Sequence, residues 1–247
     1  ARYRSFARHG RAVERSSAAL EHIKARRWEP RAIRQAEAVA TLSEQDFEWV
    51  KAHGGTPLLC PNGVSHQEFR DSPSSGPVGL IGSFDYRPNR EALRWYLDEV
   101  LPLMADAVPA ARHMVVGRGA VGACPPVDGL AVHTDVESID PFYASASIVV
   151  APAVIGGGSQ VKIAEAVAHG RCVVAAASTA TSIPSHLRDN PLVILAEGPR
   201  GFAEAVARMV TDVDRRHALE REARRRPSLS WDESFAPLVA AIESSLR

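Results

Sequence analysis

The stretch SIVVAPAVIGGGSQVKIAEAVAHGRCVVAA, from Ser147 to Ala176, decides the fold of this chain. Its pattern predicts a strand, a glycine-rich loop, a helix and a second strand. The apolar runs at its two ends are short and rich in β-branched residues, as buried parallel strands are. Ser159 is placed to cap the helix and Gly170 to end it. One right-handed βαβ unit is the simplest interpretation.

The loop and the first turns of this helix carry the polar groups. The glycines at 156–158 have no Cβ atom, so a ligand can approach the backbone closely. Backbone N–H groups at a helix N-terminus attract phosphate. Lys162 lies in the first turn, where the helix dipole disfavours a cation unless an anion is bound nearby, and Glu165 could accept hydrogen bonds from ribose hydroxyls. The spacing fits a solvated Lys–Glu pair beside a plain glycine turn equally well, and a glycine-rich loop is a weak motif by itself.

The segment PAVIGGGSQVKIAEAVAHGRCVVA resembles the donor-binding signature of GT-B glycosyltransferases of the family 4 type, P…G.G…K..EA.A.G.PVV. Other segments are similar to this family in the same order: LCPNGVSHQEF (Leu59 to Phe69), LIGSFDYRPNREALRWYLDEVLP (Leu80 to Pro102), HMVVGRG (His113 to Gly119), VHTDVESIDPFYASASIVVAP (Val132 to Pro152) and LSWDESFAPLVAAI (Leu229 to Ile242). The resemblance implies transfer of a sugar from a nucleotide-diphosphate-sugar donor to a glycan or lipid-linked acceptor. It also implies a retaining, metal-independent reaction that needs no cofactor.

The resemblance also assigns roles to individual positions. It implies that Glu165 binds the ribose, that the backbone near Asp135 and Val136 frames the base, and that the glycine loop and the residues after it hold the diphosphate. The full set of expected donor-binding residues is Gly82, Ser83, Arg87, Gly117, Asp135, Val136, Gly156, Gly157, Gly158, Ser159, Gln160, Lys162 and Glu165. These residues follow predicted strands, and ligands of doubly wound sheets bind at the carboxyl ends of strands.

Two departures from the family pattern bear on the chemistry. The family often has two glutamates eight positions apart, and here the first position is Gly157, so the residue that would touch the transferred sugar is missing. Many members also place an Arg and a Lys after the first strand of this domain, where this chain offers only Arg87. Neutralisation of the phosphates then depends mainly on Lys162. No catalytic base or nucleophile is identified, and the histidines at 113, 133 and 169 are each expected to be structural or exposed.

Composition limits the class of protein. The chain has 247 residues, 45% of them hydrophobic, and a formal net charge of zero. A balanced charge gives no reason to expect nucleic acid as a partner. Three cysteines without metal-ligand spacing indicate a reducing, cytoplasmic compartment. No carboxylate cluster suggests a metal site, and no apolar run approaches the roughly 20 residues of a membrane span.

Alternating strands and helices predict an α/β fold, a doubly wound Rossmann-like parallel sheet with an incomplete N-terminal α/β domain. Residues 1–64 resemble the end of the acceptor-binding domain, 65–230 the donor-binding domain, and 231–247 a helix that crosses back to the first domain. Because a doubly wound domain needs more than 64 residues, a fragment or an incompletely captured sequence is favoured over a shortened natural variant. The polar segment 71–77 is predicted to be a hinge.

Residues 1–37 are basic and helical in pattern, with ten Arg or Lys residues against four Glu. Pro30 is expected to divide this segment into two helices. The basic surface is consistent with peripheral contact to anionic lipid at the inner face of the membrane. An ordinary solvated helix face explains the same pattern.

Two other classes of function remain open. If the short N-terminus is natural, the chain could be a non-catalytic nucleotide-sugar-binding or partner module. A Rossmann-like oxidoreductase is disfavoured because SFDYRPN, and not G-x-G-x-x-G, follows the strand at 78–82.

Overall fold

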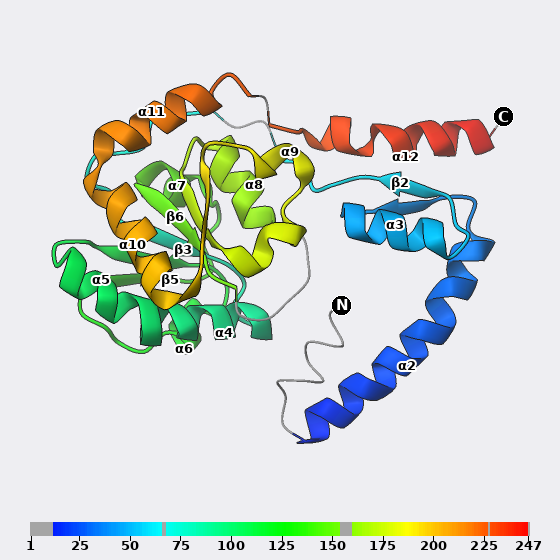
Figure 1. The fold of residues 1–247 in the computed structure, drawn as a ribbon, viewed down its shortest axis with the longest axis horizontal. Coiled ribbons are helices and arrows are strands. Elements are labelled where there is room, and N and C mark those ends of the chain that lie inside the picture. Colours follow the sequence, from blue (N-terminus) through cyan, green and yellow to red (C-terminus); the bar gives the residue numbers. More distant parts are fainter. Residues whose placement is uncertain (1–11, 66–67, 154–159, 227, 247) are drawn as a thin grey trace. The chain divides into compact units, whose positions relative to one another are not determined.

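The computed structural model describes residues 12–65, 68–153, 160–226 and 228–246 (Figure 1). The expected sites at 156–159 lie outside these ranges. Contacts divide the described residues into two compact units, a smaller one of 12–65 with 229–246 and a larger one of the remaining residues.

The larger unit is built on a six-stranded sheet in the order β5-β4-β3-β6-β7-β8, in which every pair of neighbours is parallel. The strands are β3 (Val78–Ile81), β4 (His113–Val116), β5 (Leu130–His133), β6 (Ile148–Ala151), β7 (Val173–Ala176) and β8 (Val193–Ala196). The strand order reverses between β3 and β6, which is the switch point of a doubly wound sheet. This confirms the fold class predicted from the sequence.

Helices cover both faces of this sheet (Figure 1). One face carries α4 (Arg87–Trp95), η1 (Tyr96–Val100), α5 (Leu101–Ala107), α6 (Ala120–Ala123) and α10 (Gly198–Thr211), and the other carries α7 (Asp140–Ser145), α8 (Val161–Ala168) and α9 (Ser185–Arg188). The 3₁₀ turn η2 (Ala177–Ser182) follows β7, and α11 (Val213–Ala223) follows α10. All residues of β3, β4, β6 and β7 are buried, whereas the edge strands β5 and β8 are partly exposed. Burial on both faces explains why the inner strands are continuous apolar runs.

The helix that follows β3 is interrupted just before Pro102. The sequence predicts a kink or split at this proline, because it has no N–H to donate. The structure accommodates it with the π-helical turn η1, in which the amide of Leu101 donates to the carbonyl of Tyr96. The interruption therefore begins six residues before Pro102 itself.

Helix α8 ends at Ala168, and Gly170 takes the C′ position that the sequence predicts for it. This glycine has φ +74, a conformation that strongly favours glycine. Its amide donates to the carbonyl of Val167, and the amide of Arg171 donates to the carbonyl of Ala166 at 2.8 Å. These two bonds form a Schellman motif. The motif fixes the direction in which the chain enters β7.

Segment 71–77 is held more firmly than a polar hinge would be. Ser72 is buried, and its amide donates to the carboxylate of Glu220, while its hydroxyl accepts from Arg216 at 2.8 Å. Arg216 and Glu220, both in α11, are fully buried. A second buried guanidinium group, that of Arg171, donates to the carbonyl of Arg70. The first part of the predicted hinge is thus fixed to the larger unit by buried charged groups.

The smaller unit contains α2 (Ala12–Gln35), β1 (Val39–Thr41), α3 (Glu44–Ala52), β2 (Pro57–Leu59) and α12 (Trp231–Ser245). Strands β1 and β2 pair in parallel. Ser43 caps α3 as predicted, accepting from the amide of Asp46. Ser230 and Glu233 form a capping box at the start of α12.

The prediction that Pro30 divides the N-terminal segment is wrong. Helix α2 continues through Pro30 from Ala12 to Gln35. A proline removes one backbone hydrogen bond, and a long helix rich in Ala, Glu, Lys and Arg can retain its other bonds on both sides.

Candidate functional site

Several of the predicted residues lie at the carboxyl ends of the central strands. Gly82 and Ser83 follow β3, and Gly117 follows the neighbouring β4. Gly117 has φ +137, and a Cβ atom there would lie 2.0 Å from the carbonyl oxygen of Gly82. The two strand ends therefore touch backbone to backbone, and only glycine fits at position 117.

Lys162 reaches the end of β3 from the first turn of α8. Its ammonium group donates to the carboxamide oxygen of Asn89 at 3.4 Å. The amide nitrogen of Asn89 donates in turn to the carbonyl of Ser83 at 2.8 Å. A Cβ atom on Gly82 would lie 3.6 Å from the Lys162 ammonium. The structure thus brings Gly82, Ser83 and Lys162 together, with Asn89 as the link.

The electrostatic state of Lys162 suits an anion. The side chain is half-buried, and desolvation lowers its pKa to about 8, while the charge of Glu165 acts in the opposite direction. A cation is unfavourable where it is desolvated and close to the N-terminus of a helix. An anionic ligand bound nearby would stabilise it. The pKa also lies close enough to neutrality for the charge of Lys162 to vary in the working range of pH.

Glu165 lies one turn further along α8 and is half-buried. Tyr143 of α7, which is fully buried, donates its hydroxyl hydrogen to the Glu165 carboxylate at 2.9 Å. Burial raises the pKa of Glu165, and the hydrogen bond from Tyr143 and the charges of His169 and Lys162 lower it. Lys162 and His169, which share α8 with Glu165, thus both interact electrostatically with its carboxylate.

His169 is structural, as expected. It is 7% exposed, and its ring stacks on that of Tyr143 with centroids 4.3 Å apart. Its Nδ1 lies 2.8 Å from the carbonyl of Glu165, and its Nε2 lies 3.3 Å from the carboxylate of Asp140. His113 is also buried and pairs with the hydroxyl of Tyr96 at 3.0 Å.

The cation beside Ser83 is not the one that the sequence suggested. Arg87 pairs with Glu91 of the same helix, 2.6 Å from Nε to Oε1. Arg118, which follows Gly117, places one nitrogen 3.4 Å from the hydroxyl of Ser83 and another 3.0 Å from the carboxylate of Asp85. Arg118 was not among the residues predicted from the sequence, although its place just after β4 was a usable signal.

Asp135 and Val136 follow β5, on the far side of β4 from β3. Asp135 has φ +51, the left-handed conformation that glycine, Asn and Asp adopt most readily. The hydroxyl of Thr134 donates to its carboxylate at 3.2 Å. Val136 is 40% exposed.

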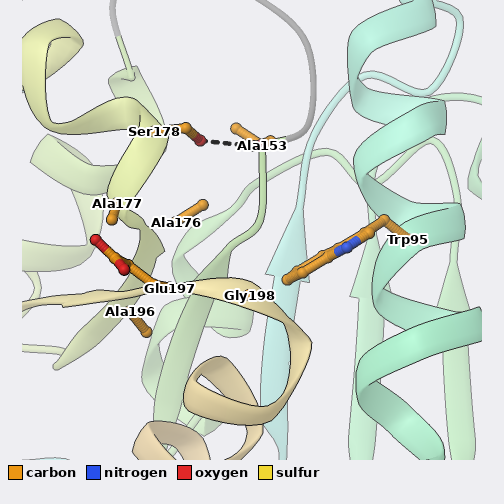
Figure 2. A pocket seen from close by; sticks show the side chains of 8 residues that line it. All are labelled: Trp95, Ala153, Ala176, Ala177, Ser178, Ala196, Glu197 and Gly198. Carbon is orange, nitrogen blue, oxygen red and sulfur yellow. Dashed lines mark hydrogen bonds between the residues drawn. The ribbon is translucent and has the colours of Figure 1, made fainter.

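Beyond β6, a groove of about 560 Å³ opens at the carboxyl ends of β6, β7 and β8 (Figure 2). Four alanines and Gly198 line it together with Trp95, Ser178 and Glu197. The hydroxyl of Ser178 donates to the carbonyl of Ala153 at 3.0 Å. The volume lies in the range of small-molecule sites, about 300–1,000 Å³. The groove was not predictable from the sequence, because small residues after strands carry no chemical signature.

Four predicted residues, Gly156, Gly157, Gly158 and Ser159, lie outside the described residues. Gln160 occupies the N-cap position of α8 without a side-chain capping bond. Within the described ranges, no group of three or more His, Cys, Asp or Glu residues is arranged to hold a metal ion. No helix in the same ranges combines the length and the apolar character that a membrane crossing requires.

The model of the family described as glycosyl transferases group 1 matches residues 77–212. No curated protein matches the sequence.

Several solved structures share the fold. A TarM mutant from S. aureus, solved in complex with UDP, has a TM-score of 0.71 at 13% identity over 88% of this chain and 46% of its own. HepE from Anabaena, solved with UDP and glucose, has a TM-score of 0.61 at 14% identity over 85% of this chain and 63% of its own. WaaG, a glycosyltransferase of lipopolysaccharide biosynthesis, has a TM-score of 0.59 at 15% identity over 82% of this chain and 61% of its own. The chain spans less than two thirds of the length of each of these proteins.

Proposed function

Because the chain belongs to the glycosyl transferases group 1 family, we propose that its larger unit binds a nucleoside-diphosphate sugar at the switch point between β3 and β6. The observation that carries this proposal is the position of Lys162. Its ammonium reaches Asn89 and the end of β3 from the N-terminus of α8. A cation beside a helix N-terminus at the end of a strand is an arrangement that suits a diphosphate.

The reaction that we propose is transfer of the sugar to a glycan or lipid-linked acceptor. The bond between the anomeric carbon and the diphosphate oxygen breaks, the acceptor hydroxyl oxygen forms the new bond to that carbon, and its proton passes to the departing diphosphate. The leaving nucleoside diphosphate gains negative charge. Lys162 would stabilise that charge in place of a metal ion, as a positioned cation does in a site with little water. Retention of the anomeric configuration is an expectation from the family resemblance.

UDP is the first donor nucleotide to test, since TarM and HepE were both solved with it. A thermal-shift screen of the chain against UDP, GDP and ADP tests the proposal, with Lys162→Ala and Glu165→Ala as matched controls. We expect one nucleotide to raise the melting temperature of the wild type and to raise that of both variants much less. If no nucleotide at millimolar concentration shifts the wild type, the site is wrongly assigned.

A non-catalytic nucleotide-sugar-binding module is the second candidate. It is favoured by Gly157, which stands where the family often has its first glutamate. Release of the nucleoside diphosphate from a bound nucleotide sugar separates the two. Binding with turnover supports the transferase, and binding without turnover in the presence of glycan and lipid-linked acceptors supports the module.

We also propose that α2 contacts an anionic lipid surface on the cytoplasmic side of the membrane. The support is the set of exposed arginines at 26, 27, 31 and 34 together with Trp28, which is 70% exposed. Basic residues attract anionic headgroups, and an indole ring suits the membrane interface. Co-sedimentation with phosphatidylglycerol vesicles, but not with phosphatidylcholine vesicles, is expected. A variant with all four arginines replaced by glutamine should lose it.

A further inference from the structure

We propose that Tyr143 is a positioning residue of the donor site: its hydroxyl holds the Glu165 carboxylate in the orientation that receives the ribose hydroxyls of the nucleotide. This inference rests on the proposed function. The hydroxyl of Tyr143 lies 2.9 Å from Oε2 of Glu165. A carboxylate accepts about four hydrogen bonds, so one bond from Tyr143 leaves capacity for a ribose diol.

Tyr143 is suited to this role because its surroundings restrict its side chain. It is fully buried, and its ring is stacked on His169 on one side and meets Phe142 edge-on, with centroids 4.9 Å apart. Its carbonyl accepts from the buried guanidinium of Arg171 at 2.6 Å. Asp140 and the carbonyl of Glu165 hold the His169 ring in turn. Contacts from α7, from α8 and from Arg171, which precedes β7, therefore orient the phenol toward Glu165.

Glu165 needs such a partner. A half-buried glutamate has many rotamers and an unfavourable charge, and both reduce its value as a hydrogen-bond acceptor for a ligand. The phenol restricts the rotamer and stabilises the ionised form. Glu165 faces Tyr143 of α7 and shares its own helix with Lys162 and His169, and the charges of these two residues stabilise the carboxylate too. Asp140 faces this group only through His169.

The test measures the affinity of the full chain for UDP and for 2′-deoxy-UDP by titration calorimetry. Because the role is exerted through the ribose, Tyr143→Phe should weaken UDP on the order of tenfold and 2′-deoxy-UDP much less. The preference of the wild type for UDP should thus shrink in Tyr143→Phe and in Glu165→Ala alike. In the double variant, Tyr143→Phe should have no further effect.

Tyr96→Phe is the matched control. Tyr96 is another fully buried tyrosine, and its hydroxyl pairs with His113 and not with the donor site. The Tyr96→Phe substitution should lower the stability of the protein without changing the ratio of the affinities for UDP and 2′-deoxy-UDP.

A pH series adds a second readout. Loss of the phenol raises the pKa of Glu165, so the decline in UDP affinity on acidification should begin at higher pH in Tyr143→Phe.

The outcomes separate this inference from the function on which it rests. A wild type that binds UDP, with Tyr143→Phe weakening both nucleotides equally and leaving the pH profile in place, overturns the positioning role alone. A wild type that binds none of UDP, GDP and ADP overturns the proposed function and the role of Tyr143 with it.

Discussion

The ammonium nitrogen of Lys162 lies 3.4 Å from the carboxamide oxygen of Asn89. This contact joins the first turn of α8 to the first turn of α4, although the two helices lie on opposite faces of the sheet (Figure 1). Both helices begin at the carboxyl edge of the sheet, so the contact closes over the end of β3. The N-termini of two helices and one cation therefore converge on one place, which favours an anionic ligand.

The charge of Lys162 should make nucleotide binding depend on pH. Its pKa is lowered to about 8, so the side chain is a cation below that pH and becomes neutral above it. UDP affinity should be constant from about pH 6.5 to 7.5 and fall as the pH rises through about 8, by up to roughly tenfold per pH unit. Titration calorimetry across this range measures it. Lys162→Arg should keep its affinity above pH 9, because an arginine remains charged there.

Removing the same charge should stabilise the free protein. A lysine whose pKa is lowered on folding binds fewer protons in the native than in the unfolded state between pH 8 and about 10.5. Stability therefore rises with pH through that window, and the cost of the buried cation is fully present below pH 8. Lys162→Met should raise the free energy of unfolding at pH 7 by roughly 1–3 kcal/mol. Urea denaturation tests this, and a variant less stable than the wild type would contradict it.

Substitution of Asn89 should change the binding of the diphosphate part of the nucleotide and not that of the nucleoside part. Asn89→Asp places a carboxylate 3–4 Å from Lys162, where it neutralises the ammonium and repels phosphate. UDP affinity should fall by about tenfold or more, whereas uridine affinity should stay the same. Asn89→Ala should have a smaller effect of the same kind. An equal loss for UDP and uridine would mean that Asn89 acts only on the fold.

Asp135 should be replaceable by glycine without loss of stability. Its φ of +51 is strained for a residue with a Cβ atom, and most of all for a β-branched one. Asp135→Val should lower the free energy of unfolding by about 1–2 kcal/mol relative to Asp135→Gly. Thermal denaturation of the two variants checks this order. Equal melting temperatures would show that the left-handed conformation is not retained in solution.

The sequence was sufficient for the fold because the signals were local and repeated. Each inner strand is an apolar run with a helix on either side, and burial on both faces of a parallel sheet requires that pattern. The end of α8 was predictable to the residue, since Gly170 supplies a left-handed conformation that few other residues adopt. The continuity of α2 through Pro30 was not predictable, because the surrounding helix formers outweigh one lost hydrogen bond.

The candidate site was predicted only in part, and the missing residues share a reason. Lys162 and Glu165 carry charge at recognisable spacing. Asn89 and Tyr143 act by reaching them from α4 and α7, 73 and 22 residues away in sequence. Such contacts follow from the packing of helices on a sheet, and no spacing rule in one sequence reveals them. Arg118 could have been found, because it directly follows the strand end at Gly117.

A structure of the full chain with the nucleoside diphosphate selected by the thermal-shift screen is the most direct test of the donor site. We expect the diphosphate within hydrogen-bond distance of Lys162 at the carboxyl end of β3, and the ribose hydroxyls hydrogen-bonded to Glu165. A nucleotide bound elsewhere, for example in the groove between Trp95 and Glu197 and away from both residues, would contradict it.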